Sequence, residues 1–184
     1  VPAGVLNIVH GYGKSAGEAL VRHPDIRAIS FTGSTAVGRR VASICGDQIK
    51  RCTLELGGKS AAIILNDVNL DDALLDQLLM AGLMNNGQVC GAQSRILVPR
   101  ARYSEIVEAI GDGMSKMIVG DPNEDSSQLG PLVAERQRTR VLGYIEAGKS
   151  EGARVVVGGG RPDDLEKGWY VTPTIFADAN NQMK

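Results

Sequence analysis

The sequence is poor in aromatic side chains and in net charge. Aromatic residues make up 4% of its 184 residues, so an aromatic-rich recognition surface is not expected. Its 20 basic and 21 acidic residues leave a net charge of -1 and form no block of one sign. Because nucleic acids and anionic membranes are bound through concentrated positive charge, neither is an expected partner.

Long apolar runs and paired cysteines are also missing. The longest near-continuous apolar stretch, residues 78–84, is far shorter than the roughly 20 residues that span a bilayer. Cys45, Cys52 and Cys90 form no CxxC pair, which fits a reducing compartment, with the cytoplasm as the expected location. The first ten residues carry neither an initiating Met nor a signal peptide, which predicts a fragment.

Apolar runs and helical spacing alternate along the chain. Strand-like runs occupy residues 5–9, 28–31, 51–56, 60–65, 95–99, 154–157 and 170–176. Three- and four-residue spacing predicts helices over 15–22, 36–44, 70–83, 103–118 and a segment that ends near residue 149. This alternation predicts an α/β architecture with largely parallel sheets. No helix separates 51–56 from 60–65, which indicates a domain boundary there.

Local signals predict where some elements begin and end. Gly46 is expected to close the helix over 36–44, and Asn69 is expected to cap the start of the next helix. That second helix carries apolar residues on several faces, so we expect it to be buried on most sides. Pro173 places the last apolar run at a sheet edge or a strand end.

The first glycine turn, at residues 11–16, matches the dinucleotide-binding fingerprint in a permissive form. It follows an apolar run and precedes a helical stretch, as that motif requires. The fingerprint also needs an acidic residue about 20 positions further on to hold the ribose hydroxyls. Residues 31–33 read Phe-Thr-Gly there, so a turn that packs a helix on a strand is the better interpretation.

A second glycine turn, at residues 57–60, matches the end of a phosphate-binding P-loop. The complete motif needs a glycine where Thr53 stands and a helix after the lysine. The residues that follow Lys59 form a strand-like run instead. Nucleoside triphosphate hydrolysis is therefore excluded.

A third turn, Gly-Ser-Thr-Ala-Val-Gly at residues 33–38, lies between a strand-like run and a helix. Free backbone N–H groups and the helix dipole at such a helix N-terminus suit a phosphate group. Capping of the helix by Ser34 or Thr35 explains the same residues equally well. From these residues alone the two interpretations have equal weight.

Cys90 lies among small and polar residues, within Asn-Gly-Gln-Val-Cys-Gly at residues 86–91. Such neighbours leave a sulfur accessible and a backbone N–H free to bind an oxyanion, as a nucleophile requires. The alternative is a buried cysteine that acts as a small hydrophobe, an interpretation that suits Cys45 and Cys52 well.

A nucleophilic cysteine needs a base, and no histidine follows Cys90 in the sequence. His10 and His23 both lie early in the chain, next to turns. Glu55 is the stronger candidate, because a carboxylate that interrupts an apolar strand is costly unless it has a function or a partner. A solvated glutamate on the outer face of an alternating strand is the other interpretation.

Three motifs together resemble the aldehyde dehydrogenase superfamily in their order and spacing. They are Phe-Thr-Gly-Ser-Thr-Ala-Val-Gly at 31–38, Leu-Glu-Leu-Gly-Gly-Lys-Ser at 54–60 and Gly-Gln-Val-Cys at 87–90. The resemblance implies a parallel-sheet, aldehyde dehydrogenase-like α/β fold. Residues 1–57 would form the C-terminal half of the dinucleotide-binding domain, and residues 58–184 most of an incomplete catalytic domain.

The resemblance also implies a role for each candidate residue. Cys90 would attack an aldehyde as a thiolate, and hydride transfer to NAD or NADP would leave a thioester on its sulfur. Water activated by Glu55 would then release a carboxylic acid, whereas relatives that acylate coenzyme A generally lack this glutamate. The residues implied to contact the dinucleotide are Gly33, Ser34 and Gly38 at the pyrophosphate and Leu56 and Gly57 near the nicotinamide. No metal is implied.

Several functional residues of the family have no counterpart in this chain. An oxyanion-hole asparagine and two ribose-binding residues precede the segment similar to residues 1–4, and a nicotinamide-ribose glutamate follows residue 184. Because one oxyanion donor is worth about 10²–10³-fold in rate, we expect this chain alone to oxidise aldehydes poorly or not at all. The parent protein is expected to be a homo-oligomer, while the aldehyde and the choice between NAD and NADP stay open.

Two other functions fit the same residues. A thiol hydrolase or acyltransferase would use Cys90 and Glu55 without redox chemistry, and would cleave an activated ester without any dinucleotide. A catalytically silent fragment would keep the motifs as structural relics. The rate of alkylation separates this last alternative from the other two. An activated Cys90 should be alkylated faster than Cys45 and Cys52 near neutral pH.

Overall fold

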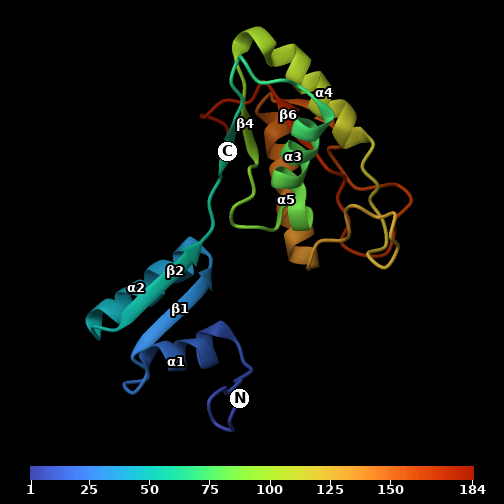
Figure 1. Cartoon of the computed structure of the whole chain (residues 1–184). Coiled ribbons are helices and arrows are strands. Elements are labelled where there is room, and N and C mark those ends of the chain that lie inside the picture. Colours follow the sequence, from blue (N-terminus) through green and yellow to red (C-terminus); the bar gives the residue numbers. More distant parts are fainter. The chain divides into compact units, whose positions relative to one another are not determined.

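The computed structural model describes residues 1–184 in two units, Val1–Gly58 and Lys59–Lys184 (Figure 1). Each unit combines helices with a two-stranded parallel sheet, which confirms the predicted α/β class. The predicted division after residue 57 lies next to this boundary. The roles assigned to the two sides stay predictions.

The first unit is built around a parallel β–α–β motif. A π-helical turn at Gly13–Gly17 leads into α1 (Glu18–Arg22), β1 (Ala28–Gly33), α2 (Thr35–Asp47) and β2 (Arg51–Leu56). The strands pair in parallel, and α2 is the crossover between them. Ser34 begins α2 by accepting a hydrogen bond from the Val37 N–H at 3.4 Å, which satisfies one donor of the first turn.

The β1–β2 sheet has one apolar and one polar face. Gly38 of α2 lies against Leu56, since a Cβ added to Gly38 would be 2.6 Å from a Leu56 methyl carbon. Successive side chains alternate between faces, and paired residues share a face. The face toward α2 therefore carries Ile29, Phe31, Cys52, Leu54 and Leu56. The opposite face carries Ala28, Ser30, Thr32, Arg51, Thr53 and Glu55, all exposed.

Helix α2 continues through Gly46 to Asp47, so the prediction that Gly46 closes it is wrong. The chain turns instead at Ile49, whose φ is 54°. The Lys50 N–H then donates to the Cys45 carbonyl at 2.8 Å, in the bonding pattern of a Schellman motif. The pairing of β2 with β1 decides where this turn lies, because β2 must begin where Arg51 pairs with Ala28 of β1.

Glu18 connects α1 to α2 through an ion-pair network. Its carboxylate accepts hydrogen bonds from Arg40 Nε at 2.8 Å and from Arg22 Nε at 2.6 Å. These hydrogen bonds, first that of Arg40 and then that of Arg22, lower the pKa of Glu18 from 4.5 to about 2. The ionised form of Glu18 therefore stabilises the packing of the two helices.

We expect acid to weaken the first unit through Glu18. Because the folded pKa is depressed, this stabilisation is complete above the ordinary value of 4.5 and is lost as the pH falls toward about 2. Thermal unfolding followed by circular dichroism across this window measures the loss. Glu18→Gln should flatten the dependence, whereas exposed Glu108→Gln should not; equal acid sensitivity of the wild type and Glu18→Gln would contradict the prediction.

The second unit contains short strands and three longer helices. Its elements are β3 (Ala61–Ile63), α3 (Asp72–Leu83), a 3-10 turn at Met84–Gly87, β4 (Arg95–Leu97), a 3-10 turn at Arg100–Arg102, α4 (Tyr103–Ser115), α5 (Glu135–Ser150), β5 (Arg154–Val157) and β6 (Ile175–Ala177). β3 pairs with β4 in parallel, whereas β5 and β6 are antiparallel. The prediction of largely parallel sheets thus holds for two of the three sheets.

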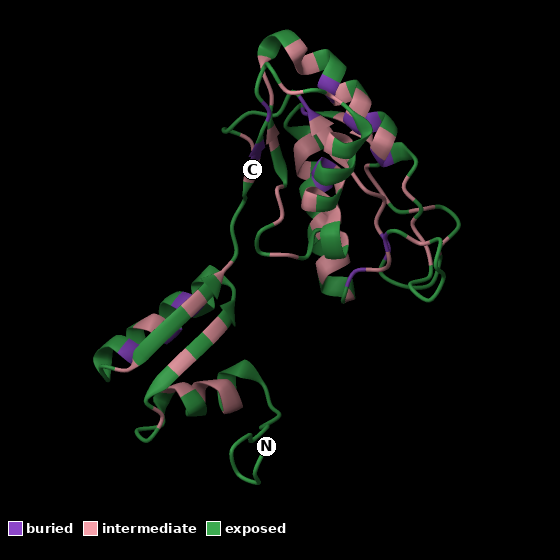
Figure 2. Ribbon diagram, viewed as in Figure 1, coloured by how far each residue is buried: buried purple, intermediate pink, exposed green.

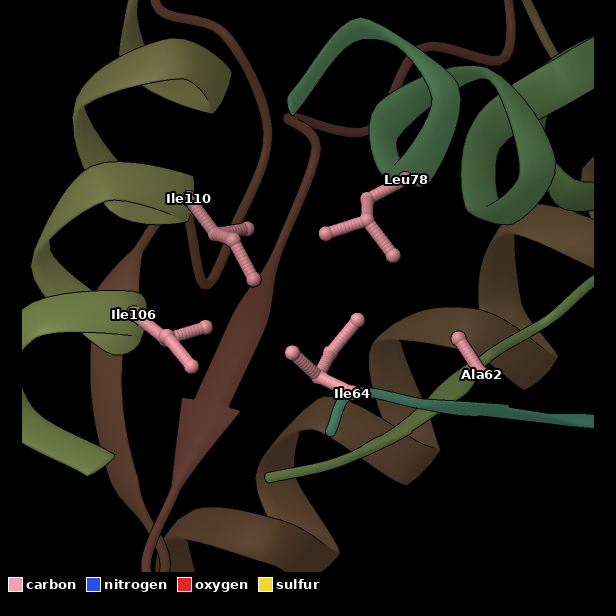
Figure 3. Close-up of a cluster of buried hydrophobic side chains, with 5 residues drawn as sticks. All are labelled: Ala62, Ile64, Leu78, Ile106 and Ile110. Atoms are coloured by element: carbon pink, nitrogen blue, oxygen red, sulfur yellow. The ribbon is translucent and has the colours of Figure 1, made fainter. Parts of the chain in front are cut away.

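The core of the second unit forms where β3 meets α3 and α4. Side chains from these elements converge in Figure 3: Ala62 and Ile64 from β3 and its end, Leu78 from α3, and Ile106 and Ile110 from α4. Ile106 is 0% exposed. Full burial of an aliphatic side chain of this size contributes about 1.5–3 kcal/mol to the free energy of folding. This cluster therefore holds α4 against α3, the helix that precedes the turn before Cys90.

The predicted strand over residues 5–9 is wrong. That segment contains no strand, and residues 1–14 are exposed throughout (Figure 2). An apolar run becomes a strand only where another strand pairs with it, and the sheet of this unit consists of β1 and β2 alone. The glycine turn at 11–16 therefore follows no strand, which removes one requirement of the dinucleotide fingerprint.

Two predictions about α3 are also wrong. The helix is capped by Asp71 rather than Asn69, because the Asp71 carboxylate accepts a hydrogen bond from the Leu74 N–H at 2.9 Å. Leu78 is buried, but Met80 is 63% exposed, so the helix is not buried on most sides within this chain. Its outer apolar residues line an open groove beside β3.

Candidate functional site

The segment before Cys90 has an uncommon backbone conformation. Asn85, Asn86 and Gly87 follow one another with φ values of 51°, 57° and 72°. Asparagine and glycine adopt this left-handed region at lower cost than other residues. The turn reverses the chain after α3, so that the Gln93 N–H donates to the Ala81 carbonyl at 2.9 Å.

Asn86 fastens this turn to a distant loop. Its amide nitrogen donates to the carbonyl oxygens of Gly130 at 3.0 Å and Pro131 at 2.9 Å, and its amide oxygen accepts from the Gly130 N–H at 3.2 Å. Two residues later, Gln88 Oε1 accepts from the Val133 N–H at 3.1 Å. The chain leading to Cys90 is thus held at two points against residues 130–133.

Sequence reasoning missed Asn86 as a positioning residue. Two signals were available, namely the Asn-Asn-Gly sequence typical of left-handed backbone and the Gly-Pro pair at residues 130 and 131. Neither signal shows that the two segments meet, because they are more than forty residues apart. Only the tertiary fold brings them together.

Cys90 is accessible, as its small neighbours predicted. Its side chain is exposed and its thiol is free. The Cys90 backbone N–H has no hydrogen-bond acceptor in the chain, while the Ala92 N–H closes a turn on the Val89 carbonyl at 3.2 Å. An exposed sulfur beside an uncommitted N–H is the arrangement needed to attack a carbonyl and bind its developing oxyanion.

The other two cysteines differ from each other. Cys45 is 1% exposed, which agrees with a small core residue. Cys52 is exposed, so its interpretation as a buried hydrophobe is wrong. It lies in the first half of β2, where all three residues are exposed, whereas Leu54 and Leu56 further along the strand are half-buried.

Glu55 lies on β2 of the first unit, on the polar face of the sheet. It is exposed and pairs in register with Thr32. Within its unit it occupies the position of a solvated residue on an alternating strand. Cys90 belongs to the second unit, and the pairing of the two residues stays a prediction.

The turn before α2 lies at the N-terminus of a helix. Gly33, Ser34 and Thr35 are exposed, and they lie where a strand ends and a helix begins. The first-turn N–H groups of a helix have no intrahelical acceptor and carry the positive end of the dipole. Ser34 satisfies the Val37 N–H, so the capping interpretation is observed, and the remaining donors still suit a phosphate.

The remaining predicted cofactor residues have distinct positions. Gly38 is buried against Leu56, and this close helix–strand contact leaves no room for a side chain. Gly57 follows β2 and is exposed. The structure therefore brings Gly33, Ser34, Gly38 and Leu56 together around the N-terminal half of α2, and their contacts with a dinucleotide stay predictions.

The structure contains neither a metal-binding cluster nor a membrane-spanning helix. No group of three or more His, Cys, Asp or Glu side chains lies close enough to bind a metal ion. No helix has the length and apolar character that a membrane crossing demands. Cys90 and the turn before α2 are the predicted sites whose residues the structure leaves exposed.

We expect Asn86→Ala to destabilise the second unit by about 2 kcal/mol, since it leaves two partly buried carbonyl groups without this donor and puts alanine at positive φ. Urea unfolding measures this loss. Asn86→Gly is the matched variant, because it keeps the backbone geometry and removes only the amide. A loss with alanine but not with glycine would show that backbone strain, and not the amide, accounts for the effect.

Comparison with known proteins identifies the family. The profile described as "Aldehyde dehydrogenase family" matches residues 1–184. The chain belongs to the aldehyde dehydrogenase family. This confirms the resemblance that the three sequence motifs indicated.

Individual relatives agree with this assignment and show how much of them the chain covers. It is 46% identical to geranial dehydrogenase of Castellaniella defragrans over its whole length, which corresponds to 38% of that protein. A crystal structure of Mycobacterium tuberculosis aldehyde dehydrogenase complexed with NAD+ is similar with a TM-score of 0.87 and 53% identity, over 91% of this chain and 34% of that one. For the Bartonella henselae aldehyde dehydrogenase the TM-score is 0.95 and the identity 38%, over 100% of this chain and 38% of that one. This chain therefore spans little more than a third of these aldehyde dehydrogenases.

Proposed function

We propose that this chain supplies the nucleophile, the base and part of the dinucleotide site of an enzyme that oxidises an aldehyde to a carboxylic acid. The observation that carries the proposal is the exposed thiol of Cys90 beside its own uncommitted N–H, in a chain of the aldehyde dehydrogenase family. The relatives named above are dehydrogenases, and one was crystallised with NAD+, which supports a nicotinamide dinucleotide, NAD or NADP, as the cofactor.

The residues of this chain divide the reaction between them. The Cys90 thiolate adds to the carbonyl carbon, and the Cys90 N–H stabilises the resulting oxyanion. The dinucleotide, when bound, supplies the hydride acceptor. Cys90 then holds the acyl group as a thioester, and Glu55 removes a proton from the water that hydrolyses it. Cys90 leaves as the thiolate and is ready for another substrate.

The residues present fit the dinucleotide at the start of α2. Gly33, Ser34 and Thr35 are exposed there, and the first turn of the helix has donors for a pyrophosphate. Gly38 lets α2 lie directly on Leu56, which keeps the helix N-terminus level with the end of β2. The free cysteines support the proposed cytoplasmic location. The family resemblance supports the proposed homo-oligomeric state of the parent protein.

A hybrid enzyme tests the proposal. Residues 1–184 replace the matching segment of geranial dehydrogenase, with which they share 46% identity, and formation of reduced nucleotide from geranial is followed by its absorbance. We expect turnover that depends on both NAD+ and the aldehyde. Cleavage of p-nitrophenyl acetate without nucleotide, in a folded hybrid that oxidises no aldehyde, would instead support the thiol hydrolase alternative.

A further inference from the structure

Two cysteines outside the proposed catalytic site face each other across the α2–β2 contact. Gly38 lies against Leu56, which identifies the face of β2 that α2 covers. Because side chains alternate along a strand, Cys52 points to the same side as Leu56. Cys45 is buried on α2 together with Gly38 and Val41, so it lies on the helix face toward the sheet.

The two cysteines also lie at the same level. α2 runs back along the sheet from the end of β1 to the start of β2 (Figure 1). From Gly38 to Cys45 the helix rises about 10 Å, and from Leu56 back to Cys52 the strand covers about 13 Å. The hydrogen bond of 2.8 Å from the Lys50 N–H to the Cys45 carbonyl further holds the start of β2 against the end of α2.

The two side chains lie at the same end of the α2–β2 contact, and their environments differ. Burial of the Cys45 thiol, followed by a hydrogen bond with Cys52, raises the pKa of Cys45. Cys45 is 1% exposed, whereas Cys52 is exposed. A reagent in solution therefore reaches Cys52 first, and Cys45 is its nearly buried neighbour on the facing helix.

We propose that Cys45 and Cys52 form a dithiol site that is oxidised to an intramolecular disulfide by small disulfide reagents. The Cys52 thiolate attacks one sulfur of the reagent and releases the first reagent thiolate, which leaves a mixed disulfide on Cys52. Cys45 loses its proton to solvent, attacks the Cys52 sulfur and expels the second reagent thiolate. The two cysteines give up two electrons, and the reagent disulfide is reduced to two thiolates.

This site is independent of the proposed dehydrogenase function. The pair lies at the far end of α2 from Ser34, and neither cysteine has a role in aldehyde oxidation. Oxidation closes the loop of residues 45–52, which contains the turn at Ile49. We expect the disulfide to stabilise this connection, because a cross-link restricts the unfolded chain.

Peptide mapping of the full chain tests the proposal. The folded protein is treated with 5,5′-dithiobis(2-nitrobenzoate), remaining thiols are blocked with N-ethylmaleimide, and trypsin is added without reductant. Cleavage after Arg40, Lys50, Arg51 and Lys59 separates the two cysteines into peptides 41–50 and 52–59. We expect these peptides to be recovered joined by a disulfide, and a thionitrobenzoate adduct to remain on Cys90 alone.

Two variants provide controls that do not depend on the dehydrogenase proposal. Cys45→Ser should leave a stable thionitrobenzoate adduct on Cys52, and Cys90→Ser should give the same joined peptides as the wild type. A lasting adduct on Cys52 of the wild type, a Cys52–Cys90 link or chains cross-linked through Cys52 would overturn the inference. Because the decisive result comes from the wild-type chain, it stands even where a variant folds poorly.

Discussion

Replacing Cys90 by alanine in the hybrid enzyme is expected to lower aldehyde oxidation by about 10⁴-fold or more, as loss of a catalytic nucleophile does in other enzymes. The thiol is the atom to which the substrate carbon bonds, so no later step proceeds without it. Initial rates of nucleotide reduction at saturating aldehyde measure the effect. Retained binding of the nucleotide, followed by fluorescence, would show that the variant is folded.

The matched control for Cys90 is Cys52→Ala. Both thiols are exposed, but only Cys90 has an uncommitted backbone N–H beside it in a turn fastened by Asn86. The control should keep the wild-type rate. Loss of activity with Cys52→Ala, or full activity with Cys90→Ala, would remove Cys90 from the mechanism.

Glu55→Gln is expected to slow steady-state turnover by about 10²–10⁴-fold, the usual contribution of a general base. The glutamine cannot accept a proton from water, but formation of the thioester on Cys90 does not need this carboxylate. Nucleotide reduction should therefore show a rapid first turnover, followed by a slow phase limited by hydrolysis. Stopped-flow absorbance resolves the two phases.

This kinetic pattern separates the two interpretations of Glu55. The structure shows an exposed carboxylate on the polar face of the β1–β2 sheet, where a purely solvated residue would also lie. Glu108→Gln, at another exposed glutamate, should leave both phases unchanged. If Glu55→Gln also left both phases unchanged, Glu55 would be only a surface residue, and another group would activate the water.

Local patterns were reliable where strands and helices pair with their neighbours in the chain. The β1–α2–β2 motif followed from apolar runs and a glycine turn, and Ser34 was among the predicted caps. Predictions that concerned a single residue without its partners were weaker. Gly46 and Asn69 were sensible helix-end signals, yet the strand register of Arg51 and the carboxylate of Asp71 decided the actual ends.

The sequence by itself determined the family, the α/β class and the accessibility of Cys90, because motif spacing and small neighbouring residues are local properties of the chain. The tertiary structure decided what no local pattern contains: that Asn86 holds the Cys90 turn against Gly130 and Pro131, and that Cys45 and Cys52 lie on facing sides of α2 and β2. The physical reason is that such contacts depend on the register and packing of several elements at once.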